Sequence, residues 1–398
     1  MHENAVNKLN AQIVGMLKNC KIADSWFEWE SVRASFRSIA KELSRHKSEH
    51  IKEDDVYSIL SELLFDYITE QAKIPKEVSG RLQELVGEER LIQLAENITS
   101  YLVGIPHSVS AELEFAQLTS AVEAHKEVGH AVQVGFRGSS YFGDPNLGGL
   151  GLMTAMLSRK SFFIRVAAKG AASWSIESTT NRALVSSLKI LLHHAIDQKL
   201  IEVKDRGVVA QGIFTHAHQI SRIKIKTTEN AIWTRENSIE LPLEICMLLD
   251  RMAAGQAGEN YVSNLLGCFE VPVKLLESQD EASLRIKSAI EWSLDSLTAE
   301  NETMAFLKAC IGLEALLGES ESGGALTESL ADRCAYLIAT SIRSRKSIRD
   351  RFKDLYKVRS KIVHGAISHL DRANRVQLDF ARHFLVSAIR REMQLLMP

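Results

Sequence analysis

Apolar residues recur at spacings of three, four and seven residues near both ends of the chain, and this periodicity most constrains its fold. Such spacing places apolar side chains on one face of a helix. Near the N-terminus the pattern includes Val6, Leu9, Ile13 and Leu17. Near the C-terminus it recurs in four successive runs: Met304, Leu307, Ile311 and Leu317; Leu330, Leu337 and Ile338; Ile348, Phe352, Leu355 and Ile362; and Val376, Phe380, Phe384, Ala388 and Leu395. We therefore predict a mainly α protein, with a helical N-terminal region over 1–105 and a helical bundle over 281–398.

The middle of the chain, residues 106–240, has the pattern of a mixed α/β domain. Its apolar or alternating runs predict strands at 130–134, 162–167, 208–214 and 220–226, and a helix at 178–199. A glycine-rich stretch from Gly135 to Gly151 lacks the spacing of a dinucleotide-binding or phosphate-binding loop, so we interpret it as a turn-rich connection. Residues 241–280 predict a helical connector to the final bundle.

The composition, 45% apolar and 25% charged over 398 residues, is that of an ordinary globular protein. No run of about 18 apolar residues predicts a membrane span, and the N-terminus lacks the pattern of a secretory signal. We therefore predict a cytoplasmic protein with no membrane partner. The five cysteines are far apart and form no C-x2-C pair, which argues against a disulfide framework and a zinc site and predicts reduced thiols. We expect no metal or other cofactor.

Positive charge is concentrated at the C-terminal end of a chain whose formal net charge is -2. Residues 341–398 contain 14 Lys and Arg against 5 Asp and Glu. Clustered cations can hold a phosphate backbone without reading its sequence, so we predict RNA contacts in this region. The residues assigned to this role are Arg345, Arg349, Lys353, Lys357 and Lys361. The same run also fits a solvated helix face that binds no ligand.

Gly365 predicts the end of the helix that contains Phe352, because glycine readily takes the left-handed conformation that terminates helices. His364 then caps this helix, where the negative end of the helix dipole favours the imidazolium form and substrate can reach the ring. Arg359 lies five residues earlier. An arginine can neutralise the charge that builds on a phosphorane, while a histidine transfers protons at the ribose and leaving oxygens, without a metal.

Other local patterns are less informative. The R-x4-H spacing also occurs at Arg45 and His50, but no glycine directly follows, and we interpret that match as chance. Ser347 with Asp350, and Ser368 with Asp371, resemble capping boxes and predict the starts of the last two helices.

The segment L-Y-K-V-R-S-K-I-V-H-G, from Leu355 to Gly365, resembles the R-S-x3-H-G signature of HEPN domains, particularly the Apea-like branch found in prokaryotic defence proteins. Upstream, Ile311 to Leu317 resembles the L-E-x-L-L helix that precedes this signature. The resemblance covers residues 281–398. It implies a helical domain that dimerises, so that two R-x4-H helix ends form one metal-independent ribonuclease site. It also implies an abortive-infection or toxin role in antiviral defence, with transfer RNA a frequent substrate.

The resemblance assigns the catalytic roles to Arg359 and His364. Three further residues are accessory candidates, each with a structural alternative. Ser360 is either a hydrogen-bonding group or a surface residue. Glu314 either orients Arg359 or forms a structural ion pair, since a carboxylate on an apolar helix needs a partner. Tyr356 either stacks on a base or packs inside the bundle.

Taken together, these features predict an endoribonuclease that acts as a homodimer through its C-terminal bundle and is regulated by residues 1–280. A phage-derived trigger or inhibitor is a further expected partner. The leading alternative is a non-catalytic HEPN-type module that binds RNA, a nucleotide or another protein through the same basic surface.

Overall fold

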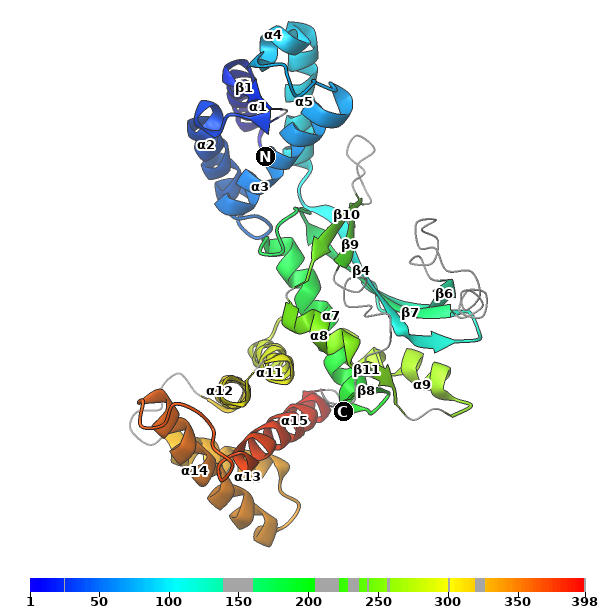
Figure 1. The fold of residues 1–398 in the computed structure, drawn as a ribbon, viewed down its shortest axis with the longest axis vertical. Coiled ribbons are helices and arrows are strands. Elements are labelled where there is room, and N and C mark those ends of the chain that lie inside the picture. Colours follow the sequence, from blue (N-terminus) through cyan, green and yellow to red (C-terminus); the bar gives the residue numbers. More distant parts are fainter. Residues whose placement is uncertain are drawn as a thin grey trace. The chain divides into compact units, whose positions relative to one another are not determined.

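The fold is given by a computed structural model, shown in Figure 1, and it is mainly helical, as predicted. The structure describes residues 1–24, 26–138, 160–204, 222–227, 236–241, 243–255, 258–299, 301–318 and 326–396. The chain divides into two compact units that interleave along the sequence. The first contains Met1–Leu113, Arg165–Val185 and Arg222–Leu241, and the second contains Glu114–Ile164, Ser186–Ser221 and Pro242–Pro398. The four predicted ranges therefore do not correspond one to one with these units.

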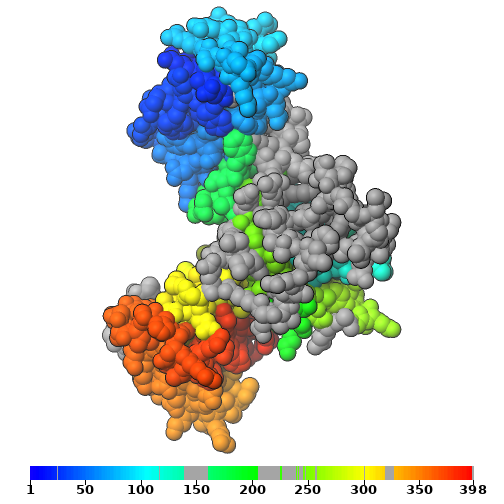
Figure 2. All heavy atoms as spheres, viewed as in Figure 1, coloured from blue at the N-terminus to red at the C-terminus, as the bar shows by residue number. Residues whose placement is uncertain are grey.

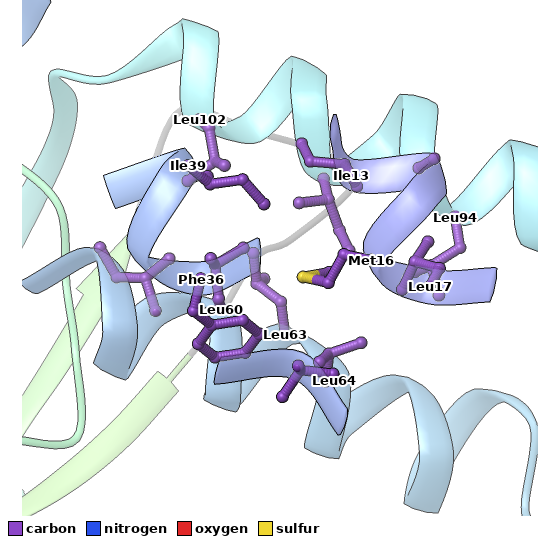
Figure 3. Close-up of a cluster of buried hydrophobic side chains, with 14 of the residues drawn as sticks. Ile13, Met16, Leu17, Phe36, Ile39, Leu60, Leu63, Leu64, Leu94 and Leu102 are labelled. Carbon is purple, nitrogen blue, oxygen red and sulfur yellow. The ribbon is translucent and has the colours of Figure 1, made fainter. Parts of the chain in front are cut away.

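The N-terminal region is built from helices around one apolar core. The helices are α1 (Glu3–Asn19), α2 (Trp29–Lys47), α3 (Glu53–Asp66), the π-helix η1 (Tyr67–Gln71), α4 (Leu82–Val86) and α5 (Glu88–Gly104). Figure 3 shows Ile13, Met16 and Phe36 turned toward one another in this core, where all three side chains are fully buried. The predicted spacing of Leu9, Ile13 and Leu17 is thus the buried face of α1.

This region also contains a small antiparallel sheet that helical spacing does not reveal. Its strands, in the order β2-β1-β3, are β1 (Lys21–Ala23), β2 (Trp26–Phe27) and β3 (Gly80–Arg81). The prediction of a helical N-terminal region is thus correct for most of residues 1–105 but misses this sheet. Each strand is only two or three residues long, which is too short for an alternating pattern to appear in the sequence.

Six strands are hydrogen-bonded in the order β10-β9-β4-β7-β6-β5. Their bounds are β4 (His107–Ser120), β5 (Ala124–Val128), β6 (Val132–Gly138), β7 (Lys160–Gly170), β9 (Arg222–Thr227) and β10 (Glu236–Glu240). Strands β9 and β4 pair antiparallel with Ile225 opposite Ala111, and strands β6 and β5 pair antiparallel with Phe136 opposite Ala124. The strands expected at 130–134, 162–167 and 220–226 correspond to β6, β7 and β9.

Two parts of the middle region differ from expectation or fall outside the described residues. Sequence reasoning missed the long strand β4, although Ser and Glu alternate with its apolar residues from Val109 to Phe115 and such alternation is typical of a strand. The expected helix at 178–199 is α7 (Thr179–Asp197). The strand expected at 208–214 and most of the glycine-rich stretch, from 139 to 151, lie outside the described residues.

Short elements follow before the final bundle. They are β8 (Ile201–Val203), which pairs antiparallel with β11 (Met252–Ala254), and the helices α8 (Leu243–Asp250), α9 (Tyr261–Gly267) and α10 (Glu270–Glu277). The helical connector predicted for 241–280 is thus mostly helical. No helix among the described residues has both the length and the apolar character needed to cross a bilayer.

The C-terminal bundle carries the candidate site. It consists of α11 (Glu281–Thr298), α12 (Glu302–Leu317), α13 (Leu326–Ile338), α14 (Ile342–Val363) and α15 (Val376–Leu396). Its core includes fully buried Phe306 and Phe352, and the ring of Phe352 stacks on that of Tyr356 at 4.8 Å. In Figure 2 the yellow-to-red atoms of the bundle form one contiguous body.

The starts of the last two helices differ from the predicted capping boxes. Helix α14 begins at Ile342, because the Ser341 hydroxyl accepts the backbone N–H of Ser344 at 3.1 Å and caps the helix six residues earlier than expected. Ser347 therefore lies inside α14. Helix α15 begins at Val376, and Asp371 instead accepts the backbone N–H of Asn374 in the preceding turn, at 2.8 Å. Both capping-box predictions are wrong.

Replacing Ser341 by Ala should lower the free energy of unfolding by about 1 kcal/mol, because the cap satisfies a backbone donor that the helix leaves free. Replacing Ser347, inside the helix, by Ala should instead leave it unchanged or raise it by a few tenths of a kcal/mol, because Ala favours the helix interior. Urea denaturation of both variants measures the difference. An equal loss in both would contradict the assigned start of α14.

Candidate functional site

Helix α14 ends in the turn that the sequence predicts. His364 is the C-cap, and Gly365 has a φ of 73° in the left-handed region. The N–H of Gly365 donates to the carbonyl of Ile362 at 3.1 Å, and the N–H of Ala366 donates to the carbonyl of Lys361 at 2.8 Å. This pair of bonds is the Schellman arrangement, which satisfies the last carbonyls of a helix. The position predicted for His364 is confirmed.

The His364 side chain is exposed at this helix end. Its backbone N–H donates to the carbonyl of Ser360 at 3.0 Å, which fixes the backbone while the imidazole faces solvent. Ser360 is also exposed, and its hydroxyl makes no hydrogen bond with any described residue. Both side chains are therefore accessible to a ligand.

Arg359 contacts a different helix. Its Nη2 lies 3.1 Å from Oε1 of Glu314 in α12 and 3.4 Å from Oε2, with side-chain exposures of 30% for Arg359 and 26% for Glu314. The sequence allows Glu314 either to orient Arg359 or to form a structural ion pair, and this contact fits both roles. No hydrogen bond joins Arg359 to His364 among the described residues.

Tyr356 packs inside the bundle. Its side chain is 6% exposed, and its ring stacks on Phe352 with an angle of 11° between the ring planes. Burial raises the pKa of Tyr356, and the Glu314 carboxylate raises it further. The hydroxyl lies beside Glu314 without meeting the geometry of a hydrogen bond. In this structure Tyr356 therefore takes the packing alternative rather than a base-stacking one.

Two of the cations predicted to contact RNA are bound by α13. Arg349 forms ion pairs with Glu328, at 2.9 Å, and with Asp332. Lys353 also binds Glu328, at 2.6 Å, and this hydrogen bond lowers the pKa of the Glu328 carboxyl. Sequence reasoning missed both acids. Their i, i+4 spacing on α13 was the available signal, because it places two carboxylates on one helix face.

The other three cations differ in their surroundings. Lys357 pairs with Asp354 of its own helix at 2.8 Å, and this hydrogen bond raises the pKa of Lys357. The guanidinium carbon of Arg345 lies 4.1 Å from the centroid of the Tyr336 ring, which is a cation–π contact. Lys361 is exposed and has no ion-pair partner among the described residues. Of the five, Arg345 and Lys361 thus have no acidic partner among the described residues, and Lys361 is the more exposed of the two.

The described residues contain no group of three His, Cys, Asp or Glu side chains placed to hold a metal ion. All five cysteines are free thiols, and four are buried. Burial raises the pKa of Cys20 and of Cys334 to about 12, which keeps these thiols protonated and unreactive.

Comparison with known proteins identifies no relative, since no family model, curated protein or solved structure matches the chain. Any functional assignment must therefore rest on the sequence and structure of this chain.

Replacing Gly365 by Ala should lower the free energy of unfolding by about 1–2 kcal/mol, because a Cβ disfavours the left-handed backbone. No atom lies within 4 Å of the position that a Cβ would occupy, so the loss would come from the backbone and not from a clash. Asn tolerates this conformation better, and Gly365→Asn should lose less. Urea denaturation measures the free energy of unfolding of both variants. Equal decreases in Gly365→Ala and Gly365→Asn would contradict a backbone origin of the loss.

Proposed function

We propose that this protein is a metal-independent endoribonuclease of the HEPN type, acting in antiviral defence as a homodimer through its C-terminal bundle. The observation that carries the proposal is the end of α14. An exposed imidazole caps a helix whose previous turns hold Arg359, and the flanking residues match the R-S-x3-H-G signature. The helical bundle around this end is consistent with the helical domain that the resemblance implies.

The proposed reaction is transfer within the RNA chain. The 2'-hydroxyl of one ribose attacks the adjacent phosphorus, and the bond from phosphorus to the 5'-oxygen breaks. The products are a 2',3'-cyclic phosphate and a 5'-hydroxyl. An imidazole accepts the proton of the 2'-hydroxyl, an imidazolium returns a proton to the leaving oxygen, and a guanidinium stabilises the charge on the phosphorane oxygens.

The geometry of one helix supports the proposed pairing of two chains. Five helical residues correspond to a rotation of about 500°, so Arg359 and His364 lie about 140° apart around the axis of α14. Side chains that diverge in this way favour a site that a second chain completes. A symmetric pair of helix ends supplies two imidazoles and two guanidinium groups, which together can surround a scissile bond.

The alternative function is a non-catalytic module that binds RNA. The observation that favours it is the ion pair between Arg359 and Glu314, because a guanidinium already paired with a carboxylate offers less charge to a phosphorane. The two proposals differ in what they demand of His364. Only catalysis needs its imidazole to exchange protons.

Replacing His364 by Ala should lower the rate of RNA cleavage by a factor of about 10² to 10⁴, because proton transfer by an imidazole is lost. The bundle should stay folded, since the side chain is exposed. His369→Ala is the matched control, because His369 is a second exposed imidazole five residues further along and lies outside the signature. Gel analysis of labelled RNA with purified protein provides the rates.

EDTA should leave the wild-type rate unchanged in this assay, since the proposed chemistry uses no metal. Cleavage by His364→Ala at the wild-type rate, or equal losses in His364→Ala and His369→Ala, would exclude the assigned role. Binding of RNA without cleavage by the wild type would favour the binding module instead.

A further inference from the structure

One line of exposed residues follows the whole length of α14 and ends at His364. Its members recur every three or four residues, so they lie on one side of the helix. They are Arg343, Lys346, Asp350, Asp354, Lys357 and Lys361. We call this line the α14 stripe. From Arg343 to Lys361 it extends about 27 Å at 1.5 Å per residue.

The stripe is separate from the cations that α13 neutralises. Arg349 and Lys353 face α13, where Glu328 and Asp332 compensate their charges. Arg343 and Lys346, in contrast, have no ion-pair partner among the described residues. Positive charge is therefore open to solvent at both ends of the stripe, with Lys361 next to His364 and the Arg343–Lys346 pair at the far end.

The placement of Arg343 and Lys346 does not serve the stability of the helix. The first turn of α14 contains no acidic residue, although the N-terminal end of a helix dipole favours anions and disfavours cations. Arg343 in the first turn thus opposes the dipole, and Lys346 adds a second unpaired charge one turn further along. A bound polyanion would offset this unfavourable interaction with the helix dipole. Ligand binding therefore offers a role for the two residues, whereas helix stability does not.

The surface is hollowed at this end of the stripe. A shallow cavity of about 690 Å³ is lined by Ile342, Arg343, Lys346, Ser347, Asp350, Arg351 and Asp354. Ile342 is 84% exposed, which is unusual for a large apolar side chain and adds an apolar contact to the two cations. The combination suits a ligand that presents phosphates together with the flat apolar face of a base.

We infer that the α14 stripe binds a single strand of RNA, with phosphates at Arg343 and Lys346, a base against Ile342, and the chain running toward His364. This inference rests on the proposed function, because that function supplies the reason for RNA to lie at His364. A single strand fits better than a duplex, because its bases are free to turn toward an apolar contact. Asp350 repels the backbone between the two cationic ends and limits the affinity.

The inference makes predictions of opposite sign for neighbouring residues of the stripe. The double variant R343A/K346A should raise the Kd for a single strand about tenfold and lower the slope of log Kd against log salt by about 1.4, because two phosphate contacts are lost. Asp350→Asn should lower the Kd. Arg391→Ala is the matched control, since it removes an exposed arginine of the same bundle that lies on α15, off the stripe.

The measurement is fluorescence anisotropy of full-length protein with a labelled, uniformly 2'-O-methylated RNA, which has no free 2'-hydroxyl and resists cleavage. The proposed catalysis can therefore fail while this binding is observed, and the two failures are distinguishable. The expected opposite shifts, with Arg391→Ala near the wild-type Kd, would support the inference. Absence of binding by the wild type, equal shifts in R343A/K346A and Arg391→Ala, or no gain with Asp350→Asn would overturn it.

Discussion

Burial of Phe352, Leu355 and Tyr356 fixes the rotation of α14, and every feature of the candidate site follows from that rotation. Fully buried Phe352 stacks between Tyr356 and Phe384, at ring distances of 4.8 and 6.2 Å. Turning the helix by even one residue, about 100°, would expose these rings and cost several kcal/mol of apolar burial. The core therefore decides which charges of α14 face α12, which face α13 and which face solvent.

The charged side chains on the three sides of α14 have different physical roles. The contacts of Arg349 and Lys353 with α13 are partly exposed, so each stabilises the bundle only modestly, and their main effect is to cancel charge locally. On the side that faces α12, Arg359 and Glu314 compensate one another. The remaining side presents Arg343, Lys346 and Lys361, none of which has an ion-pair partner among the described residues. A count of basic residues along the sequence consequently overstates the charge that a polyanion would meet.

Features that depend on local sequence patterns were predictable, whereas features that depend on contacts between distant segments of the chain were not. Helix α14 and its end were predictable, because the spacing of Phe352 and Leu355 and the conformational freedom of Gly365 are local properties. The predicted start of α14 was wrong, because Ser347 and Ser341 both precede residues that are acceptable in a helix. Only the hydrogen bond from the Ser344 N–H to the Ser341 hydroxyl distinguishes them. The pairing of Arg349 with Glu328 depends on how α13 packs against α14. The interleaved units depend likewise on tertiary contacts that no single segment encodes.

The ion pair with Glu314 is compatible with a catalytic arginine. A guanidinium group has five N–H donors in a planar fork, and the contacts of Arg359 with Glu314 use Nη2 alone. Nε and Nη1 have no partner among the described residues, so one edge of the fork is held while the other is open to a phosphate. An anchored guanidinium loses less conformational freedom when a phosphate binds than a mobile one does. Glu314 would thus act as a positioning residue, holding Arg359 in place by the same contact that reduces its net charge.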